Sequence, residues 1–514
     1  MASKYFSKKS VAQIQNESEK SELKRSLSAL NLVSLGIGCI IGTGIFVMTG
    51  QAAAQFAGPA IVMSFLMTGL CCAFVALCYA ELASMLPVSG SAYSYAYASL
   101  GEIVAWFMGW LLLLEYGIAG STVAVGWSGY VVSFLKDFHI MIPPEWTAAT
   151  GMHLINVPGE GWLQLTDDLV HELASKRIVA ATLPAVTAIF NLPAALGLLV
   201  VTTLLVLGVK ESATVNNVIV FIKVSVVLLF IGFGIFYINP ENWHPFIPTF
   251  VPDTSSSLFG HPLGYYGWGT FGWMGILRGA SYIFFAYVGF EAVSTAAQEA
   301  KNPKRDLPIG IIGSLAVCTI LYILVSLVLT GLVKYTTLNV SAPIAMAVDA
   351  IGLPWLAFLV KVGAICGLSS VMLVLMYGQT RIFYTMSKDG LLPPMFSKIH
   401  SRFQTPYVNT ILVGIVSAIV AGMTPIEDLG NLVNLGTLMA FTIICFTVIY
   451  LRIKEPTFAR PFRVPFPKVT PVLGMLSCLL LIAPLWETFV TLIPYFGLGF
   501  LIYFGYGQWH SKQR

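Results

Sequence analysis

The stretch that decides the fold is Leu35-Gly-Ile-Gly-Cys-Ile-Ile-Gly-Thr-Gly-Ile-Phe46, in which four of the twelve residues are glycine. It lies within an apolar run that is long enough to cross a bilayer. Each glycine in a helix interior costs about 1 kcal/mol relative to alanine, so the cluster predicts a helix that breaks near the middle of the membrane. Broken backbone at that depth is tolerated where it faces protein or a water-filled cavity. Such a break also indicates a transporter's substrate site, here expected at Gly42-Thr43-Gly44.

The composition places the whole chain in a membrane. Of its 514 residues, 57% are hydrophobic and only 10% are charged, whereas soluble domains average about 25% charged residues. We therefore expect an all-α membrane protein of twelve transmembrane helices, each near the roughly 20 residues that cross the hydrocarbon. The expected spans cover 30–55, 59–84, 102–133, 180–208, 215–238, 275–297, 308–333, 355–380, 408–424, 430–451, 470–488 and 491–507.

The basic residues predict the orientation. With the N-terminus in the cytoplasm, 21 of the 28 Lys and Arg residues fall in cytoplasmic segments and four in outside loops. This bias predicts a multi-pass plasma membrane protein (inner membrane in a Gram-negative cell) with both termini cytoplasmic. The net charge of +4 is thus a topology signal and not a nucleic-acid footprint. Residues 1–29 lack the apolar core and cleavage site of a signal peptide, so they are expected to form a cytoplasmic tail.

A second interrupted helix is expected in span 6. Within Phe284–Thr295, an apolar run meets Gly289, the acidic Glu291 and a Ser-Thr pair. Breaks in spans 1 and 6 imply a five-span unit that is repeated with inverted topology, and transporters bind substrate at the interface of such repeats. The expected units are a first repeat at 30–238, a second repeat at 275–451, two further spans at 470–507 and a cytoplasmic tail at 508–514.

The first break offers both polarities of main-chain groups. The half-helix that begins near Ile45 points free N–H groups and a positive dipole end at the cavity, which suits a carboxylate. The half-helices that end near Ile41 and Tyr287 offer free carbonyl oxygens, which suit an ammonium group. Together they favour a zwitterionic α-amino acid. The alternative is that these glycines only allow close helix packing, because Gly38-Cys-Ile-Ile-Gly42 has the small-xxx-small spacing.

Charges within apolar spans are costly and often mark a transport pathway. Lys223, about nine residues into span 5, is expected to exchange a proton or to replace a sodium ion beside the first break. The alternative is a structural Lys–carboxylate pair. Glu115 in span 3 either lines the pocket or pairs with a cation, and Glu291 either caps a half-helix or contacts substrate. Glu81, near the inner end of span 2, is expected to belong to a gate network or to the interface, whereas Arg278 and Lys361 are expected to snorkel from the ends of their spans.

Other classes of function lack their signatures. No phosphate-binding G-x-x-x-x-G-K-[ST] motif is present, so ATP-driven pumping within this chain is excluded. No Ser-His-acid or metal-ligand constellation appears, so we expect no enzyme, no metal and no cofactor. All eight cysteines lie in apolar spans and are expected to be packing residues.

At this point the chain resembles the amino acid–polyamine–organocation (APC) superfamily, and within it the cationic amino acid transporter (CAT) family. The resemblance covers residues 25–510 and rests on a set of motifs. They are residues 36–46, Cys78-Tyr-Ala-Glu-Leu82, Pro87-Val-Ser-Gly-Ser-Ala-Tyr93, Leu114-Glu-Tyr-Gly117, 284–295, 301–310, Tyr377-Gly-Gln-Thr-Arg381 and Lys388-Asp-Gly-Leu-Leu-Pro393.

The resemblance implies the five-plus-five inverted repeat with two additional helices, and it implies site residues. The amino acid would meet main chain around Ile40, Ile41, Gly42, Thr43 and Gly44, and around Phe285, Ala286, Tyr287 and Val288. Lys223 matches a span 5 lysine of proton-coupled bacterial members, Glu115 matches a span 3 acid, and span 8 near Leu375 would close the side-chain end. Related bacterial proteins often carry Asp where this chain has Glu291.

The sequence therefore predicts a proton-coupled amino acid symporter that works by alternating access, with an amino acid, a proton and membrane lipid as its partners. A sodium-driven symporter or an obligate exchanger on the same fold is the first rival, and Lys223 argues against sodium. A receptor that binds amino acids without moving them is the second rival. The side-chain specificity and the oligomeric state stay open.

Overall fold

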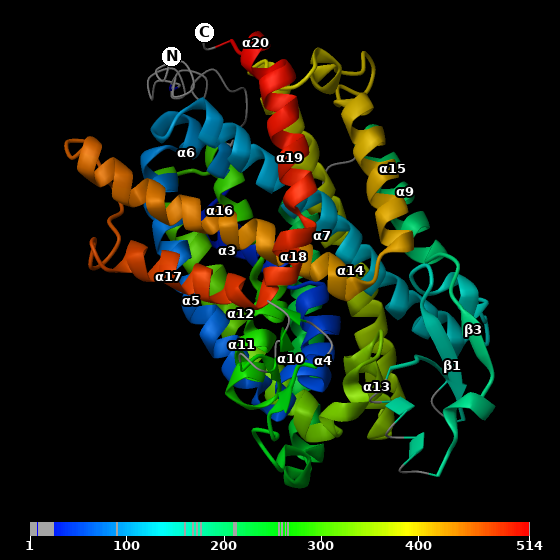
Figure 1. Cartoon of the computed structure of the whole chain (residues 1–514). Coiled ribbons are helices and arrows are strands. Elements are labelled where there is room, and N and C mark those ends of the chain that lie inside the picture. Colours follow the sequence, from blue (N-terminus) through cyan, green and yellow to red (C-terminus); the bar gives the residue numbers. More distant parts are fainter. Residues whose placement is uncertain are drawn as a thin grey trace.

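The computed structural model describes residue 8 and residues 25–88, 91–158, 161–166, 169–170, 173–174, 177–208, 213–254, 257–258, 261–262, 264 and 267–512. These residues form a helical bundle with a small layer of strands at one corner (Figure 1). The helices are α3 (Ala29–Ile40), α4 (Thr49–Ala52), α5 (Ile61–Met85), α6 (Ser91–Ser99), α7 (Glu102–Asp137), α9 (Leu192–Val206), α10 (Ala213–Gly234), α11 (Gly272–Ile283), α12 (Pro303–Leu332), α13 (Pro343–Ala350), α14 (Pro354–Lys388), α15 (Tyr407–Met423), α16 (Ile426–Lys454), α17 (Thr470–Ile482), α18 (Trp486–Thr491), α19 (Ile493–Ile502) and α20 (Gln508–His510).

Length and hydropathy identify eight helical stretches among the described residues that could cross a membrane, and three shorter apolar helices accompany them. The short ones are α3, α9 and α15. The protein is thus a mostly helical, multi-pass membrane protein. The count of twelve spans and the inverted repeat stay predictions.

The core lies where the long helices pack side by side. Helix α14 packs along α7, and α12 packs against both α5 and α3. Outside this centre, α16 lies against α7 and α17, and α15 lies against α9 (Figure 1). The breaks in the chain near the ends of α3 and α11 fall within this packed centre, so the surrounding helices hold non-helical backbone in a fixed shape.

A three-stranded antiparallel layer covers the corner near α13 (Figure 1). Its order is β2 (Gly161–Gln164), β1 (His153–Val157) and β3 (Ala185–Thr187), with Leu154 opposite Gln164 on one side and Val186 on the other. Short ladders pair β4 (Val251–Pro252) with β7 (Gly269–Thr270) and β5 (Ser257–Leu258) with β6 (His261–Pro262).

Helix α9, which corresponds to the fourth expected span, begins later than the sequence predicts. A span was expected from residue 180, but β3 lies there and α9 starts only at Leu192. Asn191 caps the helix, since its side-chain oxygen accepts a hydrogen bond of 3.1 Å from the Ala194 N–H. Pro193 follows in the first turn, where its missing N–H costs no intrahelical bond. The apolar residues before Asn191 therefore belong to the strand layer and its connection.

The end of the bundle that carries α6 and α20 is fastened by buried carboxylates. At the start of α7, Glu102 accepts hydrogen bonds from the hydroxyls of Tyr97 at 3.1 Å and Tyr503 at 3.0 Å. In α5, Glu81 is paired with Arg452 and accepts a 2.8 Å hydrogen bond from the Val464 N–H. Glu81 thus ties α5 to α16 and to the connection before α17, which agrees with a network at this end of the molecule.

Candidate functional site

The first break separates α3 from the helical turn that follows it. Helix α3 ends at Ile40, and Ile41 is extended with φ −72° and ψ 98°. Helical backbone resumes at Thr43 and continues as a π-helical segment over Gly44–Met48. A Cβ added at Gly44 would lie 2.2 Å from the Cα of Ala286, so only glycine allows this approach. The glycine-rich stretch therefore breaks the helix where the sequence predicts.

The second break lies directly against the first. After α11, a 310 segment covers Phe284–Tyr287, Val288 leaves the helix with ψ 128°, and Gly289 has φ +122°. This φ belongs to the left-handed region that favours glycine. A Cβ at Gly289 would also lie 2.9 Å from the Cβ of Cys39 at the end of α3. Backbone from the two breaks is thus in van der Waals contact at two points.

Tyr322 of α12 joins the two breaks. Its hydroxyl donates toward two main-chain carbonyl oxygens, that of Ile40 at 2.8 Å and that of Ala286 at 2.9 Å. The tyrosine is fully buried. It satisfies carbonyl groups that a broken helix leaves without a partner. The sequence analysis missed this residue, although a tyrosine within the apolar span 308–333 was the signal, because a buried tyrosine hydroxyl needs a partner.

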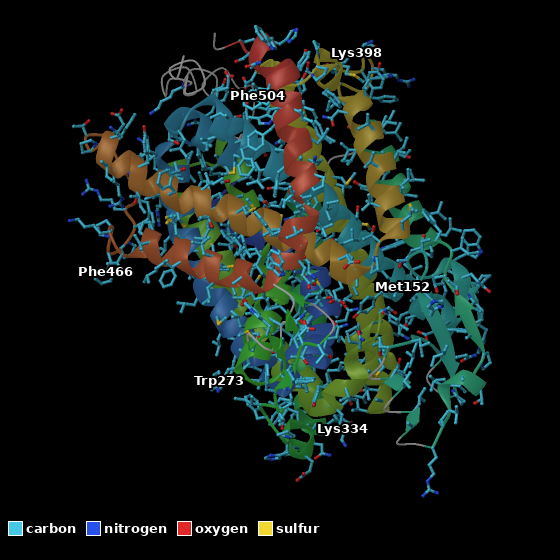
Figure 2. The ribbon with its side chains drawn as sticks, in the orientation of Figure 1. Met152, Trp273, Lys334, Lys398, Phe466 and Phe504 are labelled. Carbon is cyan, nitrogen blue, oxygen red and sulfur yellow. The ribbon has the colours of Figure 1, made fainter. Side chains whose placement is uncertain are left out.

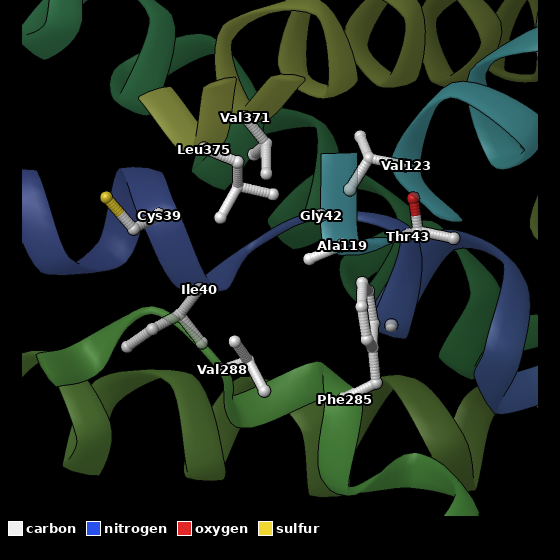
Figure 3. Close-up of a pocket in the computed structure, with 11 residues that line it drawn as sticks. Cys39, Ile40, Gly42, Thr43, Ala119, Val123, Phe285, Val288, Val371 and Leu375 are labelled. Atoms are coloured by element: carbon white, nitrogen blue, oxygen red, sulfur yellow. The ribbon is translucent and has the colours of Figure 1, made fainter. Parts of the chain in front are cut away.

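A small pocket opens between the two breaks (Figure 3). Val371 and Leu375 reach into it from α14, and Phe285 and Val288 face them from the second break (Figure 3). The room in the pocket is small, about enough for one water molecule. Its lining is Cys39, Ile40, Gly42, Thr43, Gly44, Ala119, Val123, Phe285, Val288, Val371 and Leu375.

Seven of the residues named by the sequence analysis line this pocket: Ile40, Gly42, Thr43, Gly44, Phe285, Val288 and Leu375. Ile41, Ala286 and Tyr287 lie in or beside the two breaks but outside the lining. The sequence analysis missed Cys39, Ala119, Val123 and Val371. The signal for the two residues of α7 was their place one and two turns after Glu115.

Thr43 brings a polar side chain to the lining. Its residue is fully buried, and its hydroxyl oxygen has no hydrogen-bond partner among the residues that the structure describes. The side chain packs closely on α7, since a Cβ at Gly126 would lie 2.6 Å from its Cγ2. The hydroxyl and the first N–H groups of the resumed helix therefore provide donors beside Gly42.

Lys223 lies beside the first break rather than in the pocket. Its side chain is fully buried, and its Nζ donates a 2.8 Å hydrogen bond to the carbonyl oxygen of Gly38, in the last turn of α3. Its stem packs against α14, where a Cβ at Gly367 would come within 2.9 Å of Cε. The lysine thus connects α10 with the segment of α3 that leads into the break.

Glu115 and Glu291 also lie outside the pocket lining. Both are buried, and their carboxyl groups lie near each other and near Thr437 of α16. Glu291 Oε2 accepts a 2.9 Å hydrogen bond from the Gly289 N–H, so Glu291 caps main chain at the second break. Among the described residues, Glu291 Oε1 and both carboxyl oxygens of Glu115 have no hydrogen-bond partner.

Two other charges predicted to snorkel behave differently. Arg278 is 27% exposed, and its guanidinium lies 3.7 Å from Asp253 and over the Phe56 ring. Lys361 is only 3% exposed and does not snorkel, so that prediction was wrong. Its Nζ lies 2.8 Å from Asp137 and 3.5 Å from Asp349. The two acids meet the ammonium where it is buried, and this removes the need to reach water.

Nearly the whole chain matches known proteins. The family model for amino acid permeases matches residues 27–503. The chain belongs to the amino acid permease family. The protein is therefore a membrane transporter, and not an enzyme.

Three curated relatives illustrate the range of this family. A methylthioribose transporter of Bacillus subtilis (strain 168) is 44% identical over 99% of this chain and 99% of its own length. The branched-chain amino acid permease BcaP of the same organism is 42% identical over 100% and 99%. The vacuolar cationic amino acid transporter 4 of Arabidopsis thaliana is 38% identical over 85% of this chain and 64% of its own length. Relatives of similar identity thus carry different names for their cargo, so the substrate must be argued from the site.

Proposed function

We propose that this permease moves amino acids across the plasma membrane by proton-coupled symport and alternating access. The observation that carries the proposal is the pair of breaks in contact, which brings main-chain groups of two interrupted helices to one small pocket. Transporters place substrate at such interrupted helices near mid-membrane. A zwitterion requires both kinds of main-chain group at one place.

The α-carboxylate would bind at the start of the resumed helix, where N–H groups of Gly42, Thr43 and Gly44 and the Thr43 hydroxyl are at hand. The α-ammonium would bind main-chain carbonyl oxygens around Ile40, Ile41 and Phe285–Val288. Tyr322 already donates to two of these oxygens, but a carbonyl oxygen has two lone pairs and can accept a second bond. Ile41, Ala286 and Tyr287 therefore stay in the proposed site as main-chain contacts.

Lys223 is the proposed proton carrier. A protonated Nζ donates a charge-assisted hydrogen bond to Gly38 O, whereas a neutral amine makes a weaker bond. The protonation state of Lys223 would thus change how firmly α10 holds the end of α3, next to the substrate's carboxylate site. A structural role without proton exchange is the alternative, and Lys223→Met separates the two roles.

The proposed orientation follows the charge bias of the sequence, with both termini cytoplasmic. Lys398, assigned to a cytoplasmic connector, and Lys334, assigned to an outside loop, lie at opposite ends of the molecule (Figure 2). The strand layer and α13 would then face the outside. The two repeats at 30–238 and 275–451 are proposed to move against each other around the fixed pocket.

The test is uptake of labelled Ala, Ser, Leu, Glu, Arg and Lys into proteoliposomes under an inward proton gradient, with sodium absent. We expect at least one amino acid to accumulate and a protonophore to abolish its accumulation. Accumulation only with sodium, or only with amino acid inside the vesicles, would replace symport by the sodium-driven or exchange alternative. Labelled methylthioribose belongs in the same assay, because one relative carries that name.

A further inference from the structure

The walls of the pocket are hydrocarbon at every side chain except two. Seven side chains face it with hydrocarbon alone: Ile40, Ala119, Val123, Phe285, Val288, Val371 and Leu375. Cys39 adds a thiol, and Thr43, beside the main-chain donors, adds the one hydroxyl. None of the described lining residues carries a charge. A substrate whose α-groups bind the breaks would therefore leave its side chain among hydrocarbon.

The carboxyl groups that could pair with a cationic side chain, those of Glu115 and Glu291, lie outside the pocket lining. Glu115 precedes Ala119 by one helical turn on α7, which is about 6 Å along the axis at a rise of 1.5 Å per residue. Helical side chains lean toward the N-terminus, so its carboxyl points further from the pocket than its Cα does. That carboxyl meets Glu291, which itself holds the Gly289 N–H. A guanidinium or ammonium in the pocket would thus lack its counter-charge.

Lys223 adds to the exclusion of cationic side chains. Lys223 donates to Gly38 O, and Gly38 is the neighbour of the lining residue Cys39. Like charges at short range repel, and an unpaired cation among hydrocarbon pays the full cost of its lost hydration. Charge and desolvation therefore both disfavour arginine and lysine.

The size of the site is controlled by α14 and α7. Val371 is in contact with the first break, since a Cβ at Gly42 would lie 3.5 Å from its Cγ2. Leu375 follows one turn later, and Ala119 and Val123 line the pocket from α7. The room left between them is small, so each methyl group on these side chains takes space that a substrate needs.

From this geometry we infer that the pocket selects neutral amino acids with apolar side chains, aliphatic or thioether, and rejects cationic ones. The inference rests on the proposed transport of amino acids and names the side-chain class for that site. Val371 and Ala119 are its size-determining residues.

The first experiment is competition against uptake of labelled L-leucine and, in parallel, of labelled L-alanine in the proteoliposomes described above. Unlabelled alanine, valine, leucine, methionine, arginine and lysine are the competitors. We expect the four apolar amino acids to inhibit at concentrations at least about tenfold below those needed for arginine or lysine. This comparison uses the unmodified protein and does not depend on any variant folding.

Two variants move the size limit in opposite directions. Val371→Ala removes two methyl groups and should raise the ratio of leucine to alanine uptake by about tenfold or more. Ala119→Leu adds three carbon atoms and should lower that ratio by at least a similar factor. Val416→Ala is the matched control, because Val416 lies on α15 with 52% of its surface exposed. Its uptake ratio should equal that of the wild type.

The outcomes separate this inference from the proposed function. If arginine or lysine competes as well as leucine and Glu115→Gln removes that competition, the substrate side chain reaches the carboxyl group of Glu115. The apolar class is then wrong, while amino acid transport stands. If no amino acid is taken up and only labelled methylthioribose accumulates, both the inference and the proposed function are overturned.

Discussion

Two buried lysines, one at the centre of the molecule and one at its α13 end, have different kinds of partner. At the centre, Lys223 of α10 is fully buried, and its Nζ donates to the carbonyl of Gly38 beside the first break. At the α13 end, Lys361 of α14 is 3% exposed and is held by the carboxylates of Asp137 and Asp349. Both lie in apolar helices, so burial alone does not distinguish them.

The difference lies in the partners. Asp137 and Asp349 are 39% and 49% exposed, so the two acids around Lys361 are partly in water and more than offset its charge. The Gly38 carbonyl is neutral and belongs to backbone that leads into the pocket. The partner of each buried charge, more than its depth, is therefore why Lys223 and not Lys361 is the proposed coupling residue.

The largest effect is expected at the contact between the breaks. Gly44→Ala would place a Cβ 2.2 Å from Ala286 Cα, and backbone on both sides cannot move away cheaply. We expect uptake to fall to the level of empty vesicles and thermal stability to fall with it, since overpacking costs about 1–3 kcal/mol or more. Gly232→Ala on α10 is the control, because nothing lies within 4 Å of its added Cβ. Wild-type uptake by Gly44→Ala would show that the two breaks need not touch.

The next effect tests the centre's lysine directly. Lys223→Met keeps the length of the side chain but removes the proton and the bond to Gly38 O. We expect uptake driven by the proton gradient to disappear, while substrate still raises the melting temperature of the purified variant. Full uptake with unchanged pH dependence would contradict proton coupling through Lys223 and reduce the comparison to one of packing.

A smaller loss is expected when the bridge between the breaks is removed. Tyr322→Phe deletes the hydroxyl that reaches Ile40 O at 2.8 Å and Ala286 O at 2.9 Å. A buried acceptor left without its donor costs about 1–3 kcal/mol, so substrate affinity should fall by about tenfold or more. Titration of leucine against uptake rate measures this change. Tyr495→Phe, which removes a hydroxyl bound to Trp110 O at 2.8 Å away from the breaks, is the matched control.

The smallest effect is expected at the other lysine. Lys361→Met removes an ammonium whose two acids are 39% and 49% exposed, so water can hydrate both carboxylates once the ammonium is gone. We expect uptake within about twofold of the wild type and an unchanged response to the proton gradient. If Lys361→Met abolished coupled uptake as Lys223→Met is expected to do, the distinction between centre and end would fail.

The glycines near the first break show which features the sequence could predict and which it left open. Close packing and a substrate site were alternatives for the whole stretch. In the structure, Gly36 and Gly38 are packing positions, with added Cβ atoms at 2.3 Å from Ser314 and 2.9 Å from Val220. Gly42 instead faces the pocket, and Gly44 meets the second break. Close packing thus applies to Gly36 and Gly38, a substrate site stays a prediction for Gly42 and Gly44, and spacing alone could not assign the glycines.

Properties that depend only on neighbouring residues could be predicted from the amino-acid sequence. Hydropathy places the chain in a membrane, and glycine's weak helix propensity positions the breaks, because both depend on local composition. The tertiary structure alone decided that Tyr322 joins the breaks, that Lys361 meets two acids and that Glu115 faces Glu291 outside the pocket. These contacts depend on how each helix is rotated and shifted against helices far away in the chain, and no local pattern encodes that rotation.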